Sequence, residues 1–539
     1  MGHMTLVPAT QDIMQRLEEM VDRVHDDHPL MRTDSSVAVM KIIFAAENSW
    51  RTALPHLRSN PAAIDALELF TRVTLALDQC LNWISARKAG PISSDCRSPT
   101  DARLDDFLQL AFGYACLCQL FTAWHRGLAT EVLVDQERRF VYATLPRRLS
   151  IYHGVAMQFH HAPTSSDADN ALKLSRSAIL SDFAGDLGKV PMHLWQPAFD
   201  ALYRVVEFDW DVDWAGDLGG FTMLDARRAA VTLRLWGELM IFSSSGISVA
   251  QEKDLAGLLA RYSNLQPHVA TALVRDMAFD ISNPRGDAAS YPLTRLREDT
   301  FVTWSPIKAF ITNHHRELLR RLSVRDRTTH DRLSDAKHEA LIQQLRVLVA
   351  SHEPRLSFVS KVMLKDTDID ALIIDNNAGT YFCLEVKAPL SPRTLREALD
   401  TDARRTRSGT LTDGLLKGSS VQIPKILKHA SEDPAYFLSR IKVFAGEVAL
   451  PAPRRVLGAV LSAWTFGTGE ADDIESQALP YQRTVRVITL PLLRQALIQS
   501  SGDLNLLYDM ISCNEYLATT KMHNQRVTYG DWTFEWLYA

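Results

Sequence analysis

The sequence predicts an α/β protein in two parts, a large and mostly helical N-terminal region followed by a domain that alternates strands and helices. The first observation is that apolar residues recur at intervals of three and four from about Gln11 to Gln344. The second is that three apolar runs follow each other between Leu356 and Pro389, separated by short polar turns. Three segments are expected: a helical region over 5–330, an α/β domain over 331–490, and a C-terminal helix with short strands over 491–539 that packs on the α/β domain.

The composition is that of an ordinary soluble globular protein, with 46% hydrophobic and 23% charged residues. A formal net charge of -5 argues against a protein that coats nucleic acid without specificity, although it leaves room for a local basic groove. The six cysteines include no C-x-x-C pair, and no signal peptide is visible. These features predict a cytoplasmic protein without a zinc site.

The strongest helical segments lie in the N-terminal region. One begins after Asn60-Pro61, a favourable start signal. Another contains the apolar run Phe107 to Trp124, which Gln109 and Gln119 interrupt, so we expect a buried helix rather than a membrane span. Two apolar runs flank a polar turn in Glu131 to Ala143 and predict a β-hairpin. The expected helices are Ala62–Arg87, Asp105–Arg126, Ala171–Phe183, Ala229–Phe242, Val249–Tyr262 and His268–Met277.

Three predicted strands form the part of the α/β domain that carries its chemistry. They run from Leu356 to Lys365, from Ala371 to Ile374 and from Tyr381 to Val386. The turn cluster Asp375-Asn376-Asn377-Ala378-Gly379 joins the second strand to the third and predicts an antiparallel hairpin.

Charged residues interrupt these strands at one end. Asp370 stands at the start of the second strand, and Glu385 and Lys387 lie two apart near the end of the third. Because side chains alternate along a strand, Glu385 and Lys387 share one face, and the hairpin returns Asp370 close to them. Two carboxylates offer the hard oxygen ligands that Mg²⁺ prefers, and a neighbouring lysine can orient or deprotonate an attacking water.

An aspartate followed fifteen residues later by Glu385-Val386-Lys387 resembles the PD-(D/E)xK nuclease superfamily. The resemblance covers roughly residues 331–490 and implies a restriction-endonuclease-like fold, a mixed central sheet flanked by helices. It also implies a Mg²⁺-dependent endonuclease that hydrolyses phosphodiester bonds of DNA, with Mn²⁺ as a substitute. Asp370, Glu385 and Val386 would then hold the metal beside the catalytic Lys387.

The resemblance implies two further site residues on flanking helices. A helix capped near Ser334 is expected to run to about Val349, and Glu339 near its start is a candidate for the metal site. An acid favoured by the helix dipole is an equally good interpretation of Glu339. After the third strand, Gln422 fits the place of a glutamine near the metal-bound phosphate, although Pro424 departs from regular helix geometry.

The remainder of the α/β domain is predicted from its local patterns. A helix that opens at Ser391-Pro392 carries five arginines, which line either a phosphate path or a solvated face: Arg393, Arg396, Arg404, Arg405 and Arg407. Later strands are expected at Ile441–Val448, Val456–Trp464 and Thr484–Leu490, then a helical segment at Leu493–Ser512 and two aromatic-rich strands within Val527–Tyr538.

Three hypotheses about function remain open from the sequence. The first is a DNA endonuclease acting in defence against foreign DNA, and the second is the same chemistry on RNA. The third is a non-catalytic scaffold for nucleic acid or protein, in which Glu385 and Lys387 are only a charged pair on a strand. The chain lacks a G-x-x-x-x-G-K-[ST] motif, which argues against an ATP-driven motor. The expected partners are nucleic acid, together with a second copy of the chain or an activating protein, and no membrane.

Overall fold

The computed structural model divides into two compact units. The first comprises Met1–Thr144, Phe159–Asp331 and Gln525–Trp536, and the second comprises Leu145–Gln158, Arg332–Asn524 and Leu537–Ala539. The main division therefore falls between Asp331 and Arg332, inside a single helix. The structure describes residues 6–59, 64–86, 101–145, 166–183, 187–205, 216–243, 248–296, 301–304, 308, 314–388, 396–397, 404–405, 411–446, 450–462, 486–512 and 525–538.

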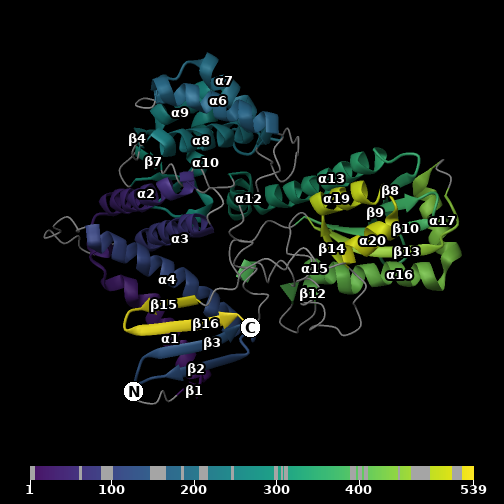
Figure 1. Cartoon of the computed structure of the whole chain (residues 1–539), viewed down its shortest axis with the longest axis horizontal. Coiled ribbons are helices and arrows are strands. Elements are labelled where there is room, and N and C mark those ends of the chain that lie inside the picture. Colours follow the sequence, from purple (N-terminus) through teal and green to yellow (C-terminus); the bar gives the residue numbers. More distant parts are fainter. Residues whose placement is uncertain are drawn as a thin grey trace. The chain divides into compact units, whose positions relative to one another are not determined.

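The first unit is mainly helical, in line with its apolar periodicity, and it also contains two small sheets (Figure 1). Its longer helices are α1 (Gln11–Arg23), α2 (Ser35–Ser59), α3 (Ile64–Ala86), α4 (Asp101–His125), α6 (Ser166–Phe183), α7 (Met192–Val205), α8 (Met223–Ser243), α9 (Glu252–Ser263), α10 (Pro267–Met277) and α12 (His314–Arg325). Its strands are β1 (Val7–Pro8), β2 (Glu131–Asp135), β3 (Phe140–Leu145), β4 (Ser248–Gln251), β5 (Ala278–Asp280), β6 (Leu293–Arg295), β7 (Phe301–Trp304), β15 (Gln525–Tyr529) and β16 (Trp532–Tyr538).

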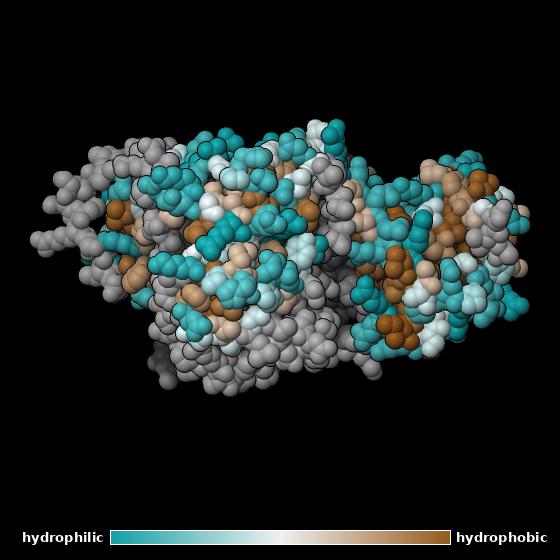
Figure 2. All heavy atoms as spheres, turned by 90° about the horizontal axis from the view of Figure 1, so that it is seen from above, coloured by the Kyte–Doolittle hydropathy of each residue, from teal (hydrophilic) through white to brown (hydrophobic). Residues whose placement is uncertain are grey.

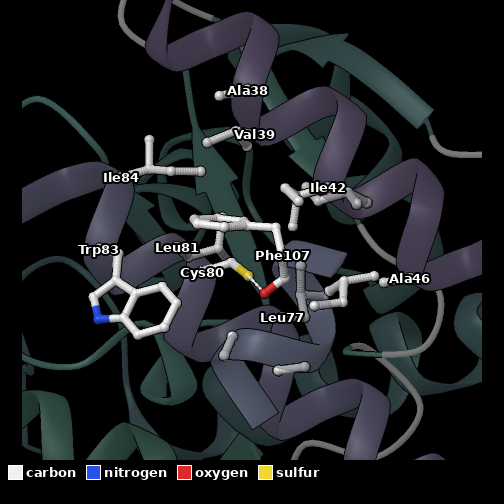
Figure 3. Close-up of a cluster of buried hydrophobic side chains, with 14 of the residues drawn as sticks. Ala38, Val39, Ile42, Ala46, Leu77, Cys80, Leu81, Trp83, Ile84 and Phe107 are labelled. Carbon is white, nitrogen blue, oxygen red and sulfur yellow. Dashed lines mark hydrogen bonds between the residues drawn. The ribbon is translucent and has the colours of Figure 1, made fainter. Parts of the chain in front are cut away.

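A hydrophobic core forms where α2, α3 and α4 pack together (Figure 3). Ile42, Leu77 and Phe107 come from the three helices in turn, and the Cys80 thiol lies 3.8 Å from the carbonyl oxygen of Phe107. Helix α4 is long and apolar enough to cross a membrane by length and composition alone, yet half of its apolar window is buried inside the protein. This packing fits the buried helix that the sequence predicts.

The C-terminal hairpin belongs to the sheet of the first unit, whose strand order is β1-β2-β3-β16-β15. The prediction that the whole of residues 491–539 packs on the α/β domain is therefore wrong for β15 and β16. The main-chain N–H of Thr533 donates to the carbonyl of Arg139 at 2.9 Å, and the Tyr529 hydroxyl donates to the carbonyl of Val21 at 3.2 Å. A strand that pairs with a partner hundreds of residues away leaves no local signal in the sequence.

The second unit is built on a mixed five-stranded sheet in the order β14-β13-β10-β9-β8. Strands β8, β9 and β10 are antiparallel, whereas β13 is parallel to β10 and β14 is parallel to β13. Its elements are α13 (Arg327–Ala350), β8 (Leu356–Met363), β9 (Asp368–Asp375), β10 (Thr380–Lys387), β11 (Arg404–Arg405), β12 (Leu411–Asp413), α15 (Leu415–Lys417), η5 (Gly418–Gln422), α16 (Ile423–Glu432), α17 (Pro434–Ala445), β13 (Arg455–Ser462), β14 (Arg486–Thr489), α19 (Leu490–Gln499) and α20 (Leu504–Ser512).

Helices cover both faces of this sheet (Figure 1). On one face, Phe382 and Leu384 of β10 share a core with residues of α13, α19 and α20. On the other face, Tyr381 of β10 packs edge-on against Phe437 of α17, and Ile423 of α16 lies directly over Gly458 of β13. Because both faces are covered, seven of the eight residues of β10 are buried and only Lys387 is partly exposed.

Three elements of the second unit differ from their predictions. The sequence predicts a strand from Ile441 to Val448, but Ile441 lies in helix α17. The Asp433 side chain caps this helix by accepting a 3.0 Å hydrogen bond from the N–H of Tyr436. Phe437 and Ile441 are buried on the same face of the helix. Helix α13 begins at Arg327, before the expected cap, because Asp326 accepts from the N–H groups of Thr328 and Thr329. The C-terminal helical segment is divided into α19 and α20 by a turn with Gly502 at φ 77°.

One face of the surface shows hydrophilic residues interspersed with small groups of hydrophobic ones (Figure 2). The large hydrophobic side chains that are exposed among the described residues include Val347, Val443 and Ile498, on three different helices. Isolated apolar side chains of this kind are normal on protein surfaces.

Candidate active site

The β9–β10 hairpin sets the register of the predicted site. Asp375 pairs with Thr380 at the turn, Ala371 pairs with Leu384 at the far end of the ladder, and the next positions of the two strands are Asp370 and Glu385. The turn requires glycine at position 379, where φ is 65° and a Cβ atom would lie 2.6 Å from the Ala452 carbonyl oxygen.

The structure brings together Asp370, Glu385 and Lys387, the three residues that the sequence predicts to form the site. The Asp370 carboxylate accepts a 2.7 Å hydrogen bond from the main-chain N–H of Val386. The Lys387 ammonium lies 2.8 Å from Oε1 of Glu385. Both carboxylates and the ammonium thus occupy one end of the sheet, where the side chain of Glu385 is only 3% exposed and that of Lys387 is 21% exposed.

Of these three side chains, Glu385 is the one whose negative charge is least compensated by hydrogen bonds. Its Oε2 atom is buried and has no hydrogen-bond partner among the described residues. Burial, followed by the negative charge of Asp370, raises the pKa of the Glu385 carboxyl to about 7, although Lys387 opposes the shift. A buried carboxylate with a free oxygen and an acidic neighbour is a site that a cation would stabilise.

The leading helix α13 contributes His338 to the site, rather than the expected Glu339. His338 Nε2 lies 3.4 Å from Oδ2 of Asp370, and this contact raises the pKa of the imidazole. The Glu339 carboxylate instead forms an ion pair with Lys361 of β8. The ion pair with Lys361 favours the second of the two interpretations of Glu339, a helix acid outside the metal site. Adjacent residues face directions about 100° apart on a helix, and the rotation of α13 about its axis is fixed only by packing.

Gln422 lies in the segment that packs over Glu385. This segment, η5, is a π-helical turn that contacts β10, and its Gly418 leaves room for the side chain of Glu385, whose Cγ would be 3.3 Å from an added Cβ. The Gln422 Oε1 atom is buried without a partner among the described residues. Pro424 stands in the first turn of α16, where proline is tolerated because its fixed φ suits the start of a helix.

The sequence predicts an arginine-rich helix after β10, and the described residues of this segment contradict part of it. Arg404 and Arg405 form β11, which pairs with β12, so a continuous helix through these positions is wrong. Arg393 and Arg407 lie outside the described residues, and Arg396 lies next to Glu397 in a short helical segment.

The residues present fit a hard divalent cation. Asp370 and Glu385 would supply carboxylate oxygens and Val386 a main-chain carbonyl, and the free Oε2 of Glu385 is the observation that favours this assignment. Within the described part of the chain, no three His, Cys, Asp or Glu side chains converge as a metal-binding group. A two-carboxylate set therefore leaves several positions to water, which is the habit of Mg²⁺.

Comparison of the chain with protein-family models, with curated proteins and with solved structures finds no match. The functional assignment therefore depends on the geometry of the site and on the resemblance of its motif.

Proposed function

We propose that the second unit is a metal-dependent nuclease that hydrolyses phosphodiester bonds, with DNA as the favoured substrate. The observation that carries the proposal is the buried Glu385, which lies beside Asp370 and Lys387 and whose Oε2 has no partner among the described residues. A carboxylate in this state is costly to the folded protein unless a ligand compensates it.

The architecture of the second unit supports the same proposal. A mixed sheet with helices on both faces is what the resemblance to the PD-(D/E)xK superfamily implies, and the three motif residues stand at adjacent positions of β9 and β10. Folds of this kind host several functions, so the site has to carry the functional argument.

Each residue has a distinct chemical role in the proposed reaction. Asp370, Glu385 and the Val386 carbonyl would hold Mg²⁺, which when bound lowers the pKa of water and neutralises phosphate charge. Lys387, held by Glu385, would orient the attacking water and stabilise the negative charge that develops on the phosphate. His338 and the Val386 N–H both contact Asp370 and fix the position of its carboxylate.

The experiment is incubation of the whole protein with plasmid DNA, linear duplex, single-stranded DNA and RNA, in Mg²⁺, Mn²⁺, Ca²⁺ and EDTA. We expect cleavage of DNA in Mg²⁺ or Mn²⁺, no cleavage in EDTA, and binding without cleavage in Ca²⁺. Glu385→Gln, which keeps the shape of the side chain, is the inactive control. Cleavage of RNA alone would transfer the assignment to RNA, and a wild-type protein that cuts no nucleic acid, or cuts equally in EDTA, would overturn the proposal.

A further inference from the structure

Lys361 occupies an unusual position directly beside the proposed site. It lies on β8, the outermost strand of the sheet, between Ser360, which pairs with Ala371, and Val362, which pairs with Ile369. The intervening position on β9 is Asp370. Lys361 therefore stands across from a residue of the site, at a point where the regular ladder is interrupted.

The backbone of Lys361 has φ at 57°, in the left-handed region that favours glycine. A lysine adopts this conformation at an energetic cost, so the surrounding structure has to hold it there. The conformation alters the direction in which the side chain leaves the strand. Strained residues of this kind concentrate at sites that bind ligands.

The side chain of Lys361 connects the edge strand to the leading helix. Its ammonium pairs with the carboxylate of Glu339, the residue after His338, which in turn contacts Asp370. The ion pair is open to solvent, because the side chains of Lys361 and Glu339 are 59% and 53% exposed. An exposed ion pair contributes little to stability, so stability alone does not account for the strained conformation.

We propose that Lys361 binds a backbone phosphate of the nucleic acid next to the bond that is cut, and that Glu339 is its counter-ion when no nucleic acid is bound. This inference rests on the proposed nuclease function and adds a specific substrate contact to it. A strongly hydrated ammonium on a flexible stem suits a phosphate contact, and the Lys361 side chain is exposed on an edge strand.

A different explanation is that Lys361 protects the edge of the sheet from pairing with another chain, a common use of lysine on outer strands. The two explanations differ in what they predict for nucleic-acid binding. A phosphate contact releases counter-ions when it forms, and its loss therefore lowers the dependence of affinity on salt. An edge-protecting lysine has no such effect.

The test measures binding of a short DNA duplex to the whole protein in Ca²⁺ over a range of salt concentrations. For Lys361→Gln, we expect weaker binding and a slope of log K against log salt that is lower by about 1. Lys253→Gln is the matched control, because Lys253 is an exposed lysine on α9 of the other unit, and its slope should equal that of the wild type.

Two further variants sharpen the test. Glu339→Gln removes the competing carboxylate and should tighten binding, but only while Lys361 is present, so the double variant should bind like Lys361→Gln. Lys361→Gly relieves the backbone conformation and should melt no lower than the wild type, which separates loss of binding from loss of folding.

An unchanged salt slope for Lys361→Gln, in a wild-type protein that binds and cuts DNA, would overturn this inference and leave the nuclease proposal standing. Self-association of Lys361→Gln with an unchanged slope would do the same and favour edge protection. A wild-type protein that neither binds nor cuts nucleic acid would overturn both.

Discussion

The β9–β10 hairpin holds a buried carboxylate at each of its ends, Asp375 at the turn and Glu385 at the open end, and the two differ in how their charge is compensated. Asp375 is fully buried, and both of its oxygens have partners. Its Oδ2 accepts from Arg355 at 3.0 and 3.2 Å, and its Oδ1 accepts from the N–H groups of Asn377 and Ala378 at 3.0 Å each. At the other end, Glu385 is almost as buried, but among the described residues only its Oε1 has a partner, Lys387, and its Oε2 has none.

Asp375 is a charge fully compensated within the fold, whereas Glu385 is not. A buried carboxylate with four donors closes the β9–β10 turn and requires nothing further. A buried carboxylate with one free oxygen beside Asp370 destabilises the folded protein until something binds it. We therefore expect changes at Asp375 to lower stability and changes at the site to lower activity.

The largest expected effect on stability is at Asp375, the carboxylate with four hydrogen-bond donors. Asp375→Ala removes the acceptor of two main-chain N–H groups and one of the partners of Arg355, which keeps its contact with Asp503, so the free energy of unfolding should fall by about 3 kcal/mol. Equilibrium unfolding in urea measures this change. A loss below about 1 kcal/mol would mean that Asp375 behaves like an exposed charge, and it would contradict the structural role that we assign to this residue.

The largest expected effect on activity is at Lys387, which pairs with Glu385 at the other end of the hairpin. Lys387→Ala removes the group proposed to orient the attacking water, and the single-turnover cleavage rate should fall by about 10² to 10³. Lys253→Ala, on an exposed face of the first unit, controls for the loss of a positive charge. Cleavage by Lys387→Ala at the wild-type rate would end its assignment as a catalytic residue.

The pH dependence of stability tests the state of Glu385 without any substrate. The pKa of Glu385 is raised from its ordinary value of 4.5 to about 7, so the folded protein binds more protons than the unfolded chain in that interval, and stability without metal should fall as pH rises through it. The full effect is on the order of 3 kcal/mol. The raised pKa of His338 acts in the same direction, since its stabilisation is present below pH 6.5 and is lost as pH rises through the folded pKa.

Glu385→Gln should remove most of this pH dependence, and denaturant unfolding from pH 4.5 to 8 measures it. If the variant and the wild type lose stability in parallel over this range, Glu385 is not the group responsible. Saturating Mg²⁺ should also reduce the slope in the wild type, because metal binding requires the ionised carboxylate.

A smaller effect is expected from the packing over Glu385. A Cβ added at Gly418 would lie 3.0 Å from Val460 Cγ2 and 3.3 Å from Glu385 Cγ, so Gly418→Ala should cost about 1 kcal/mol and weaken metal binding. Gly257→Ala is the matched control on helix α9, where an added Cβ meets nothing within 4 Å and should stabilise by up to about 1 kcal/mol. Equal melting shifts for the two variants would show that η5 is not tightly packed on the site.

The proximity of Asp370, Glu385 and Lys387 could be predicted from the sequence because it depends on a single hairpin. A short turn with Gly379 fixes the hairpin, and the alternation of β10 then places Asp370, Glu385 and Lys387 together. The contribution of α13 could not be predicted at residue level, since the choice between His338 and Glu339 depends on how the helix rotates against the sheet.

The incorrect predictions about the fold also have identifiable physical reasons. The apolar run at Ile441 fits a strand as well as a helix, and the cap at Asp433 and the packing of Phe437 decide for the helix. The C-terminal hairpin has clear strand character, but its place beside β3 is determined by contacts across almost the whole chain. Local patterns identify such elements and leave their partners undetermined.

The most direct test of the comparison measures DNA cleavage in Mg²⁺ by Glu385→Gln and Asp375→Asn, each corrected for the folded fraction. The two variants make the same change, from carboxylate to amide, at opposite ends of the hairpin. We predict that Glu385→Gln is at least as stable as the wild type at pH 8 and does not cut, whereas Asp375→Asn is less stable and cuts at the wild-type rate per folded molecule. Wild-type cleavage by folded Glu385→Gln would contradict the account.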